Sequence, residues 1–599
     1  MVRKGLGMRR TAAAGEVLFE FAIIADTHLG PTDGISPAPW KTNSLANARA
    51  KAVISDINSR KPAFVVHLGD MVHPVPAHPD HTTAAKRFHE IFAALEAPLH
   101  LVPGNHDIGD KPAIWNPAPL INEQFLNLYQ ANFGAQFYAF DHDGIHFVVV
   151  NDNLFNTGFP LEEEQWRWLE QALKGHKRTF LFTHYPLYLL NEQEDEHAEN
   201  IAEPGRSRLL DLVRRNNVEA VFTAHVHNFF YDADAGTEYY VAPSVAAVRH
   251  DYAELFSVAP AEEFGRNDLG KVGYFWVEVR SRGHVAHFLR IPGNVEGMPG
   301  AAPLLHGKTI TNSRLGIDLR YVWAQPLCVP ITGALDEFGR KWVRNDYLLA
   351  AIWEMGAGWL RVPMEDIASA EARARMLVLR RSGLRFTVFC FEVPSGRLLD
   401  ILAAAADCYD RLEIVLPGSP TANSLAQVRG VRSTTGKPVY LSKLRTSAEH
   451  AQKTGRYAHF IDCGFHLDDI PLINRLGDMR GAVDGLVFRT NVGERPGALA
   501  SAIRASIPDM GICLSVRMFG PDPASHHGTQ EQTAGLVCDA LEAAYASAGP
   551  FDIVLDTVID VDRGYFPRCG LLDRRYNHTK VSRALIETHR KLVARQPAS

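Results

Sequence analysis

Five short segments in the first half of the chain end in residue types that bind metal ions or move protons. The segments are Asp26-Thr27-His28, Gly69-Asp70, Asn105-His106-Asp107, His184 and His225-Val226-His227. Residues two apart on an extended segment point the same way, so the first and the last segment can each bring two side chains to one ion. The candidate metal ligands are Asp26, His28, Asp70, Asn105, His184, His225 and His227.

The tripeptide Asn105-His106-Asp107 combines an amide, an imidazole and a carboxylate. These groups can supply a metal ligand, a proton donor and a side chain that orients the donor. The apolar run before them stops at Pro103-Gly104, and a tight turn there would set the three residues on a loop. Alone the tripeptide is weak evidence, and its value comes from the four other segments.

Each of these segments follows an apolar run that predicts a buried strand. The runs are 18–25, 63–68, 98–102, 178–183 and 220–223. A lone Asp after a strand is usually a turn former, and a lone His is usually a surface or core residue. Open α/β sheets, however, place their sites beyond the carboxyl ends of strands, so five such segments together indicate a metal site. Apolar residues at helical spacing predict helices at 44–59, 83–95, 161–173 and 207–215.

Other histidines of this half lack the strand-end pattern, and we expect them not to bind metal. They are His67, His73, His100, His142, His146 and His176. His73 stands three residues after Asp70. The first half has no Cys and no regular Cys/His spacing, which excludes a structural zinc site there.

The motifs, in this order, resemble those of the calcineurin-like metallophosphoesterase superfamily over about residues 17–291. The short loops and the segments 161–169 and 183–186 look most like the branch of class III cyclic nucleotide phosphodiesterases and glycerophosphodiesterases. Ala224 departs from the family pattern, which usually has Gly before His-x-His. The resemblance implies a mixed α/β domain with a β-sandwich flanked by helices.

The resemblance also implies a centre of two divalent or trivalent metal ions, Mn, Fe or Zn. One ion would be held by Asp26, His28, Asp70 and His227, and the other by Asp70, Asn105, His184 and His225. Asp70 would bridge them, and a metal-bridging hydroxide would attack phosphorus. His106 would be the general acid, with Asp107 holding its ring.

The expected activity is therefore metal-dependent hydrolysis of a small-molecule phosphoric ester, with a phosphodiester as the first choice. A phosphomonoesterase on the same metals is the nearest alternative, because both substrate types need the same ligands. From a different class, the chain could be a glycosidase or a sugar-binding protein whose first domain is regulatory.

The second half alternates apolar strand candidates with amphipathic helices, which predicts a parallel (β/α)8 barrel of TIM type. Nine candidates are one more than this barrel needs: 319–324, 359–363, 385–392, 412–416, 438–444, 458–463, 485–489, 512–518 and 551–555. The segment 347–363 and the end of the chain weakly resemble glycoside hydrolase barrels. The Asn-Glu pair that many of them carry after the fourth strand is absent, because that strand ends in Leu416-Pro417-Gly418. Lone acids near other strand ends are Glu365, Glu392, Asp462, Asp556 and Asp560.

A chain of 599 residues exceeds one hydrophobic core, so we expect several parts. They are an N-terminal tail (1–16), the phosphoesterase domain (17–291), a Pro- and Gly-rich linker (292–315) and the barrel (316–595). The formal net charge of −6 does not indicate the basic surface that nucleic-acid-binding proteins usually have. No apolar run reaches the ~18 residues that span a bilayer, which argues against a membrane partner.

The expected location is the cytoplasm. Glu20 and Asp26 interrupt the first apolar run, which therefore does not form a secretory signal. The seven cysteines all lie in the second half and include no Cys-x-x-Cys pair, a pattern typical of reduced thiols. A homo-oligomer remains open.

Overall fold

The computed structural model describes residues 14–113, 118–291, 304–310, 312–320, 323–331, 337, 339–445, 463–475, 479–491, 494–518, 529–556, 558–560 and 570–596. By internal contacts the chain forms two compact units. Of the described residues, the first unit comprises those within 14–291 and 326–347, and it is called the phosphoesterase unit after the resemblance given above. The barrel unit comprises the described residues within 304–325 and 348–596.

The phosphoesterase unit is built on two sheets. The first has the order β10-β1-β2-β3, with β1 (Ala14–Ile24), β2 (Val65–His67), β3 (Leu99–Leu101) and β10 (Gly273–Arg290). The second has the order β4-β5-β6-β7-β9-β8, with β4 (Tyr138–His142), β5 (Ile145–Val149), β6 (Thr179–Phe182), β7 (Ala220–Thr223), β8 (Phe230–Asp234) and β9 (Thr237–Val241). Phe21 of the first sheet contacts Phe180 of the second at 6.1 Å between ring centroids, and Phe64 contacts Phe147 at 5.0 Å. The expected β-sandwich is confirmed.

Helices flank the sandwich. They are α1 (Ala46–Arg60), α2 (His81–Phe92), α3 (Asn105–Ile108), α4 (Glu123–Phe133), α5 (Pro160–Ala172) and α6 (Gly205–Arg215), with 3₁₀ turns η1 (Lys41–Leu45), η2 (Asp152–Leu154) and η3 (His250–Leu255). Trp166 of α5 and Leu209 of α6 pack in one core cluster with Leu181 of β6. The four helices expected from apolar spacing are present within a few residues of their predicted bounds. Apolar runs at 137–140, 145–150, 239–242 and 272–279 also predict strands, and they correspond to β4, β5, β9 and β10. The sequence predicts neither α4, which follows a Pro-rich stretch, nor β8.

A hairpin from beyond the expected linker belongs to the phosphoesterase unit. Its strands β12 (Leu327–Pro330) and β13 (Arg340–Val343) pair antiparallel. Val329 and Val343 are buried in a cluster with Tyr252 of the phosphoesterase unit. This packing explains why the hairpin does not take part in the alternation of strands and helices that forms the barrel. Residues 326–347 therefore belong to the phosphoesterase unit, although the sequence predicts that the barrel domain begins at residue 316.

The barrel unit contains a closed barrel of eight parallel strands, as expected. Its strands are β11 (Leu315–Asp318), β14 (Trp359–Pro363), β15 (Arg385–Phe391), β16 (Arg411–Leu416), β17 (Val439–Lys443), β18 (Gly485–Arg489), β19 (Gly511–Arg517) and β20 (Phe551–Asp556). The first strand precedes its predicted position at 319–324. The surplus candidate 458–463 lies outside the described residues except for Cys463, and the closed barrel is formed by the eight strands given above.

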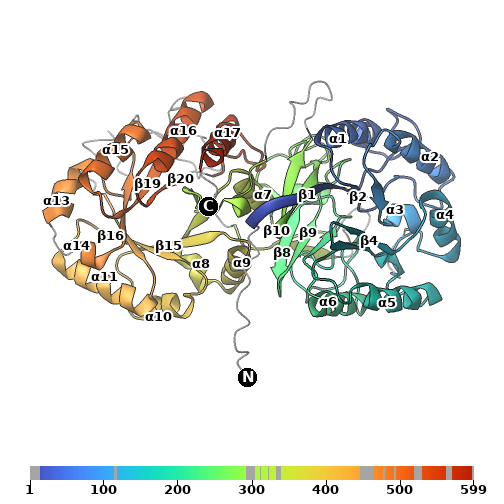
Figure 1. The fold of residues 1–599 in the computed structure, drawn as a ribbon, viewed down its shortest axis with the longest axis horizontal. Coiled ribbons are helices and arrows are strands. Elements are labelled where there is room, and N and C mark those ends of the chain that lie inside the picture. The colour runs from blue at the N-terminus through green and yellow to red at the C-terminus, as the bar shows by residue number, and fades with distance from the viewer. Residues whose placement is uncertain are drawn as a thin grey trace. The chain divides into compact units, whose positions relative to one another are not determined.

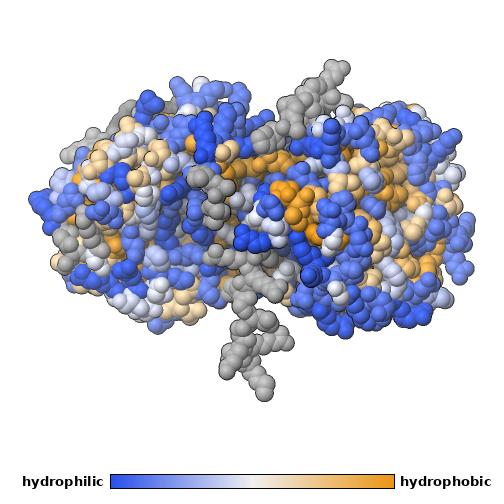
Figure 2. Space-filling model, in the orientation of Figure 1, coloured by the Kyte–Doolittle hydropathy of each residue, from blue (hydrophilic) through white to orange (hydrophobic). Residues whose placement is uncertain are grey.

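Helices surround the barrel strands (Figure 1). They are α7 (Tyr347–Glu354), α8 (Met364–Ala368), α9 (Ala370–Arg381), α10 (Arg397–Ala404), α11 (Ala422–Thr435), α13 (Ile470–Arg475), α14 (Met479–Ala482), α15 (Pro496–Ser506), α16 (Gln530–Ala546) and α17 (Lys580–Ala594), with η4 (Gly307–Thr309) and η6 (Leu467–Asp469). Figure 2 shows hydrophilic residues over much of the visible surface of each unit, as the amphipathic pattern of surface helices requires. None of the described helices has the length and apolar character needed to cross a membrane.

Candidate metal centre

Five of the seven candidate ligands have a left-handed backbone conformation. They are Asp26 (φ 50°), His28 (φ 44°), Asp70 (φ 54°), His225 (φ 67°) and His227 (φ 52°). This conformation is uncommon for residues with a side chain and costs free energy. Its repetition at the ends of three strands indicates that the surrounding structure holds these side chains at one site.

Glycines let two of these strand ends approach each other closely. A Cβ atom on Gly69 would lie 2.7 Å from the backbone nitrogen of Gly104 and 2.6 Å from Nδ1 of His184. Gly69 also has a φ of 98°. The glycine before Asp70 and the one before Asn105 are therefore both required to bring these two residues together.

The first ligand group consists of Asp26, His28 and His227. Their ligand atoms lie within 4.8 Å of one another. Nε2 of His28 is 2.9 Å from Nε2 of His227, which is 3.7 Å from Oδ1 of Asp26. Both carboxylate oxygens of Asp26 are buried without a hydrogen-bond partner in the described part of the chain. A buried carboxylate beside two imidazoles in this way is a donor set for a cation.

The second ligand group consists of Asp70, His184 and His225, with Asn105 beside them. The ligand atoms of the first three lie within 4.8 Å of one another. Oδ1 of Asn105 is 3.0 Å from Nε2 of His184 and 3.0 Å from Nδ1 of His225. Nδ1 of His184 donates to the carbonyl of Leu68 at 2.8 Å, so Nε2 is left to face the group.

Asp70 lies between the two groups. Its Oδ2 is 3.5 Å from Nε2 of His28 in the first group, and its Oδ1 is 3.4 Å from Nε2 of His184 in the second. Oδ1 also accepts a hydrogen bond of 2.8 Å from the backbone N–H of His106. All seven candidate ligands therefore come together, although they lie on loops after five different strands.

Burial sets the charge state of the donor set. It lowers the pKa of His28, His225 and His227 well below the usual range of an imidazole, so these rings are neutral. Neutral imidazole is the form that ligates a metal ion. Burial also raises the pKa of Asp26 well above its usual value, since a lone buried carboxylate is costly without a cation. The residues present thus fit a metal centre.

The ring of His106 is held by a backbone carbonyl. Its Nδ1 lies 2.6 Å from the carbonyl oxygen of His73, and because a carbonyl only accepts, Nδ1 carries the proton. The Asp107 carboxylate instead accepts hydrogen bonds from the backbone N–H of Gly104 (3.0 Å), Met71 (2.9 Å) and Val72 (3.4 Å).

The expectation that Asp107 holds the His106 ring is therefore wrong. Both residues lie in the short helix α3, where consecutive side chains point in different directions. Asp107 caps this helix by binding the N–H of Gly104.

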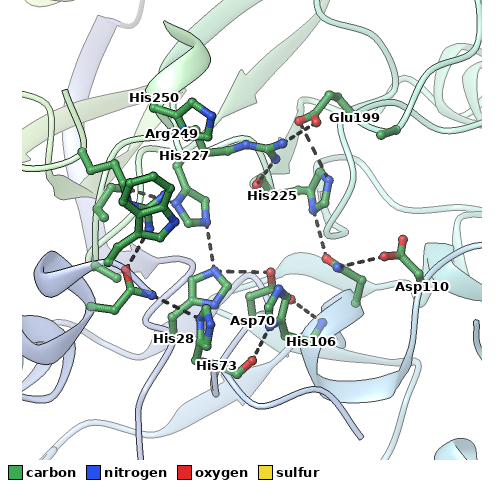
Figure 3. A pocket seen from close by; sticks show the side chains of 17 residues that line it. His28, Asp70, His73, His106, Asp110, Glu199, His225, His227, Arg249 and His250 are labelled. Carbon is green, nitrogen blue, oxygen red and sulfur yellow. Dashed lines mark hydrogen bonds and ion pairs between the residues drawn. The ribbon is translucent and has the colours of Figure 1, made fainter. Parts of the chain in front are cut away.

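A cavity of about 300 Å³ opens onto both ligand groups. Figure 3 shows His28, His73, Asp70 and His106 on one side of the cavity and His225, Glu199 and Arg249 on the other. Sequence reasoning missed several residues that line it, namely Trp40, Asn43, Asp110, Glu199, Arg249, His250 and Arg266. They lie in loops outside the strand-end pattern, and no local signal marks them.

His73, one of the histidines expected not to bind metal, also lines the cavity. Its ring nitrogen and those of His28 and His106 lie within 4.8 Å of one another. Glu199 stands behind the second ligand group, with Oε2 4.0 Å from Nε2 of His225. Oε1 of Glu199 pairs with Arg249 at 2.5 Å.

Three acids of the described barrel strands are paired with arginines. Arg361 contacts Asp318 at 2.8 Å and Glu413 at 2.7 Å. Asp556 contacts Arg320 at 2.5 Å and Arg489 at 3.3 Å. Glu392 is exposed, and Asp462 lies outside the described residues. These three ion-paired acids, among the described residues, do not present the free carboxyl pair that glycoside hydrolysis needs.

Comparison with known proteins identifies the domain around the metal centre. Residues 19–229 match the family model described as calcineurin-like phosphoesterase. The serine/threonine-protein phosphatase CPPED1 of Homo sapiens is 27% identical over 199 residues, which cover 31% of this chain and 60% of that protein. The glycerophosphodiester phosphodiesterase GpdQ of Enterobacter lignolyticus is 31% identical over 193 residues, which cover 30% of this chain and 63% of that protein.

The chain thus spans about three fifths of the length of these curated relatives. Among solved structures, purple acid phosphatase PPD1 from yellow lupin has 16% identity and a TM-score of 0.33. That match covers 45% of this chain and 51% of the lupin chain.

Proposed function

Because residues 19–229 form a calcineurin-like phosphoesterase domain, we propose that this domain hydrolyses phosphodiesters at a centre of two metal ions. The observation that carries the proposal is that the two carboxylate oxygens of Asp70 face one ligand group each. A carboxylate so placed suits a bridge between two cations. The proposed ligands are Asp26, His28, Asp70 and His227 for one ion and Asp70, Asn105, His184 and His225 for the other.

When bound, the ions, Mn, Fe or Zn, would offset negative charge on the phosphoryl group and supply Lewis-acid activation of water. The ligand set itself brings only two negative charges, from Asp26 and Asp70. With two divalent ions the centre would keep a net positive charge, which attracts a phosphate ester to the cavity.

His106 is the proposed general acid. The carbonyl of His73 holds its Nδ1–H, so Nε2 is the nitrogen free to carry a second proton. A protonated His106 would donate from Nε2 to the departing alkoxide. Asp107 acts here as a positioning residue, because its carboxylate fixes the turn that carries Asn105 and His106.

The choice of a diester is supported by GpdQ, which is named a glycerophosphodiester phosphodiesterase. A phosphomonoesterase on the same ligands is the second candidate, supported by CPPED1, which is named a serine/threonine-protein phosphatase. The same donor set serves both reactions, so the substrate decides between them.

The test uses full-length protein with bis(p-nitrophenyl) phosphate and p-nitrophenyl phosphate in parallel. We expect hydrolysis of the diester, loss of it with a chelator, and recovery when Mn²⁺ or Zn²⁺ is added back. A monoester rate ten times the diester rate would favour the second candidate. Metal-loaded protein that hydrolyses neither ester would refute both.

The variants Asp26→Asn and Asp141→Asn make a matched pair for this test. Asp141, His146 and His176 form another group of possible ligands, but Asp141 is exposed and lies away from the cavity. Asp26→Asn should lose activity, whereas Asp141→Asn should keep it. The reverse result would place the metal centre at the group formed by Asp141, His146 and His176.

A further inference from the structure

Arg266 is a buried guanidinium that has no carboxylate partner in the described part of the chain. The residue is 9% exposed. Its Nη2 donates to Oδ1 of Asn43 at 2.8 Å, and its Nε has no hydrogen-bond partner among the described residues. Burial lowers the pKa of Arg266 to about 10, so the side chain is still charged at neutral pH. A buried charge without a counterion is costly unless another group supplies one.

The nearby acid Glu263 is occupied elsewhere. Its carboxylate accepts from the backbone N–H of Lys41 and of Thr42, each at 2.6 Å, and from the Thr42 hydroxyl. These bonds hold the start of η1 against the loop that carries Arg266. They bring Trp40 and Asn43 beside the guanidinium, which lies 5.2 Å from the centroid of the Trp40 ring.

Trp40, Asn43 and Arg266 line the same cavity as the candidate metal ligands. A second arginine of this cavity, Arg249, already pairs with Glu199 at 2.5 Å. The two arginines therefore differ: Arg249 forms an ion pair with a carboxylate, whereas Arg266 forms none with the described residues. Arg266 thus brings to this wall of the cavity a positive charge that no described carboxylate contacts.

We propose that Arg266, with Asn43 and Trp40, forms a subsite for a second anionic group on the substrate, a carboxylate or a further phosphate. The inference rests on the proposed function, in which the metal ligands take the reacting phosphoryl group. A guanidinium suits this task because its N–H groups match the oxygens of a carboxylate or a phosphate. Trp40 packs beside the cation and Asn43 fixes it through Nη2. The favoured substrates are phosphodiesters with an additional negative charge away from the scissile bond.

Two pairs of diesters test this preference in the metal-loaded full-length protein. Glycerophosphoserine and glycerophosphoethanolamine differ only in a carboxylate. Thymidine 5′-(p-nitrophenyl phosphate) with and without a 3′-phosphate differs only in that phosphate. We expect the more anionic member of at least one pair to have a kcat/KM about 10- to 100-fold higher, the range of a charge-assisted hydrogen bond. The pair that shows the effect identifies the anion.

Arg266→Gln should abolish this preference by raising the KM for the more anionic diester. It should change the rate of hydrolysis of bis(p-nitrophenyl) phosphate by less than about threefold. Arg266→Lys should keep part of the preference, because it keeps the charge but loses the planar fork. The control is Arg208→Gln, since Arg208 stacks on Trp166 at 4.4 Å but does not line the cavity. Thermal melting checks that each variant is folded.

Two results would overturn the inference: a wild type without preference in either pair, or an Arg266→Gln variant that loses equal activity on all diesters. Calorimetric binding of O-phosphoserine and phosphoethanolamine makes the same comparison without turnover. A protein that prefers O-phosphoserine through Arg266 but hydrolyses no diester would retain the subsite and refute the proposed phosphodiesterase. Equal binding of the two would count against the subsite.

Discussion

Lys341 lies 2.6 Å from Asp251, although 90 residues separate them. Lys341 is on β13, in the hairpin that follows the first barrel strand, and Asp251 is in η3 of the phosphoesterase unit. Both side chains are almost fully buried. Asp251 also lies 3.7 Å from Arg249, whose guanidinium pairs with Glu199 behind His225. The hairpin therefore reaches the wall of the candidate metal centre through a chain of charges.

We expect Lys341→Met to destabilise the phosphoesterase unit. Breaking a buried ion pair by removing one partner costs about 3–5 kcal/mol, because the other charge stays buried. Urea unfolding followed by tryptophan fluorescence measures the loss. The control is Arg340→Met, at an exposed position of the same hairpin. A loss below about 0.5 kcal/mol, the usual range of a surface change, would show that Lys341 is dispensable.

Asp70→Asn should weaken both metal sites together, whereas His28→Ala should mainly empty one. The reason is that Asp70 faces both ligand groups and His28 belongs to one. Metal content by mass spectrometry after equilibrium dialysis tests this. Active wild-type protein that saturates at one ion per chain would contradict a dinuclear centre.

His106→Ala should keep its metal ions but lose about 10²–10⁴-fold in rate on substrates with poor leaving groups, the usual share of general acid catalysis. p-Nitrophenolate needs little protonation, so the loss on its esters should be smaller. Rates on alkyl and p-nitrophenyl diesters measure the difference. Equal losses on both, or a parallel loss of metal, would assign His106 another role.

The variant Asp107→Asn distinguishes the role of Asp107 from that of its neighbour His106. Its carboxylate accepts from three backbone N–H groups, and an amide placed there turns a donor toward them. We expect a loss of about 1–3 kcal/mol in the free energy of unfolding. The dependence of rate on leaving group should stay that of the wild type, in contrast to His106→Ala. If the dependence of rate on the leaving group changed without a loss of stability, Asp107 would be assigned a role in catalysis.

Glu219 should make stability depend on pH in the acid range. Burial raises its pKa, but hydrogen bonds from Arg178 (2.6 and 2.8 Å) and His284 (2.9 Å) lower it to about 2. Because the folded pKa lies below the ordinary value of 4.5, this stabilisation is present above pH 4.5 and is lost as pH falls toward 2. The shift corresponds to about 3 kcal/mol.

Unfolding of the wild type and Glu219→Gln at several pH values measures this contribution. The difference between the two proteins should be largest above pH 4.5 and should shrink as the carboxylate is protonated. The exposed Glu164→Gln provides the comparison at a surface position. A difference that does not vary with pH would show that the ion pair contributes nothing to the acid sensitivity.

The sequence alone determined most of the architecture. Apolar runs of strand length and helical spacing are local signals, so they located every sandwich strand except β8, four flanking helices and the barrel. The ligand set was also local, since every ligand follows the end of a strand. Parallel strands present their carboxyl ends at one edge of a sheet. This geometry makes the convergence of Asp26, Asp70 and Asn105 predictable in one sheet, and that of His184 and His225 in the other.

Only the tertiary structure decided which partner each side chain has. Asp107 was expected to hold the His106 ring, but the direction of its side chain depends on the turn that it caps. Arg266 and Asn43 are 223 residues apart, and Lys341 and Asp251 are 90 apart. Such contacts leave no periodicity in the sequence, because they form only when separate loops pack together. The wall of the cavity, and with it the substrate preference, is therefore a property of the packed chain.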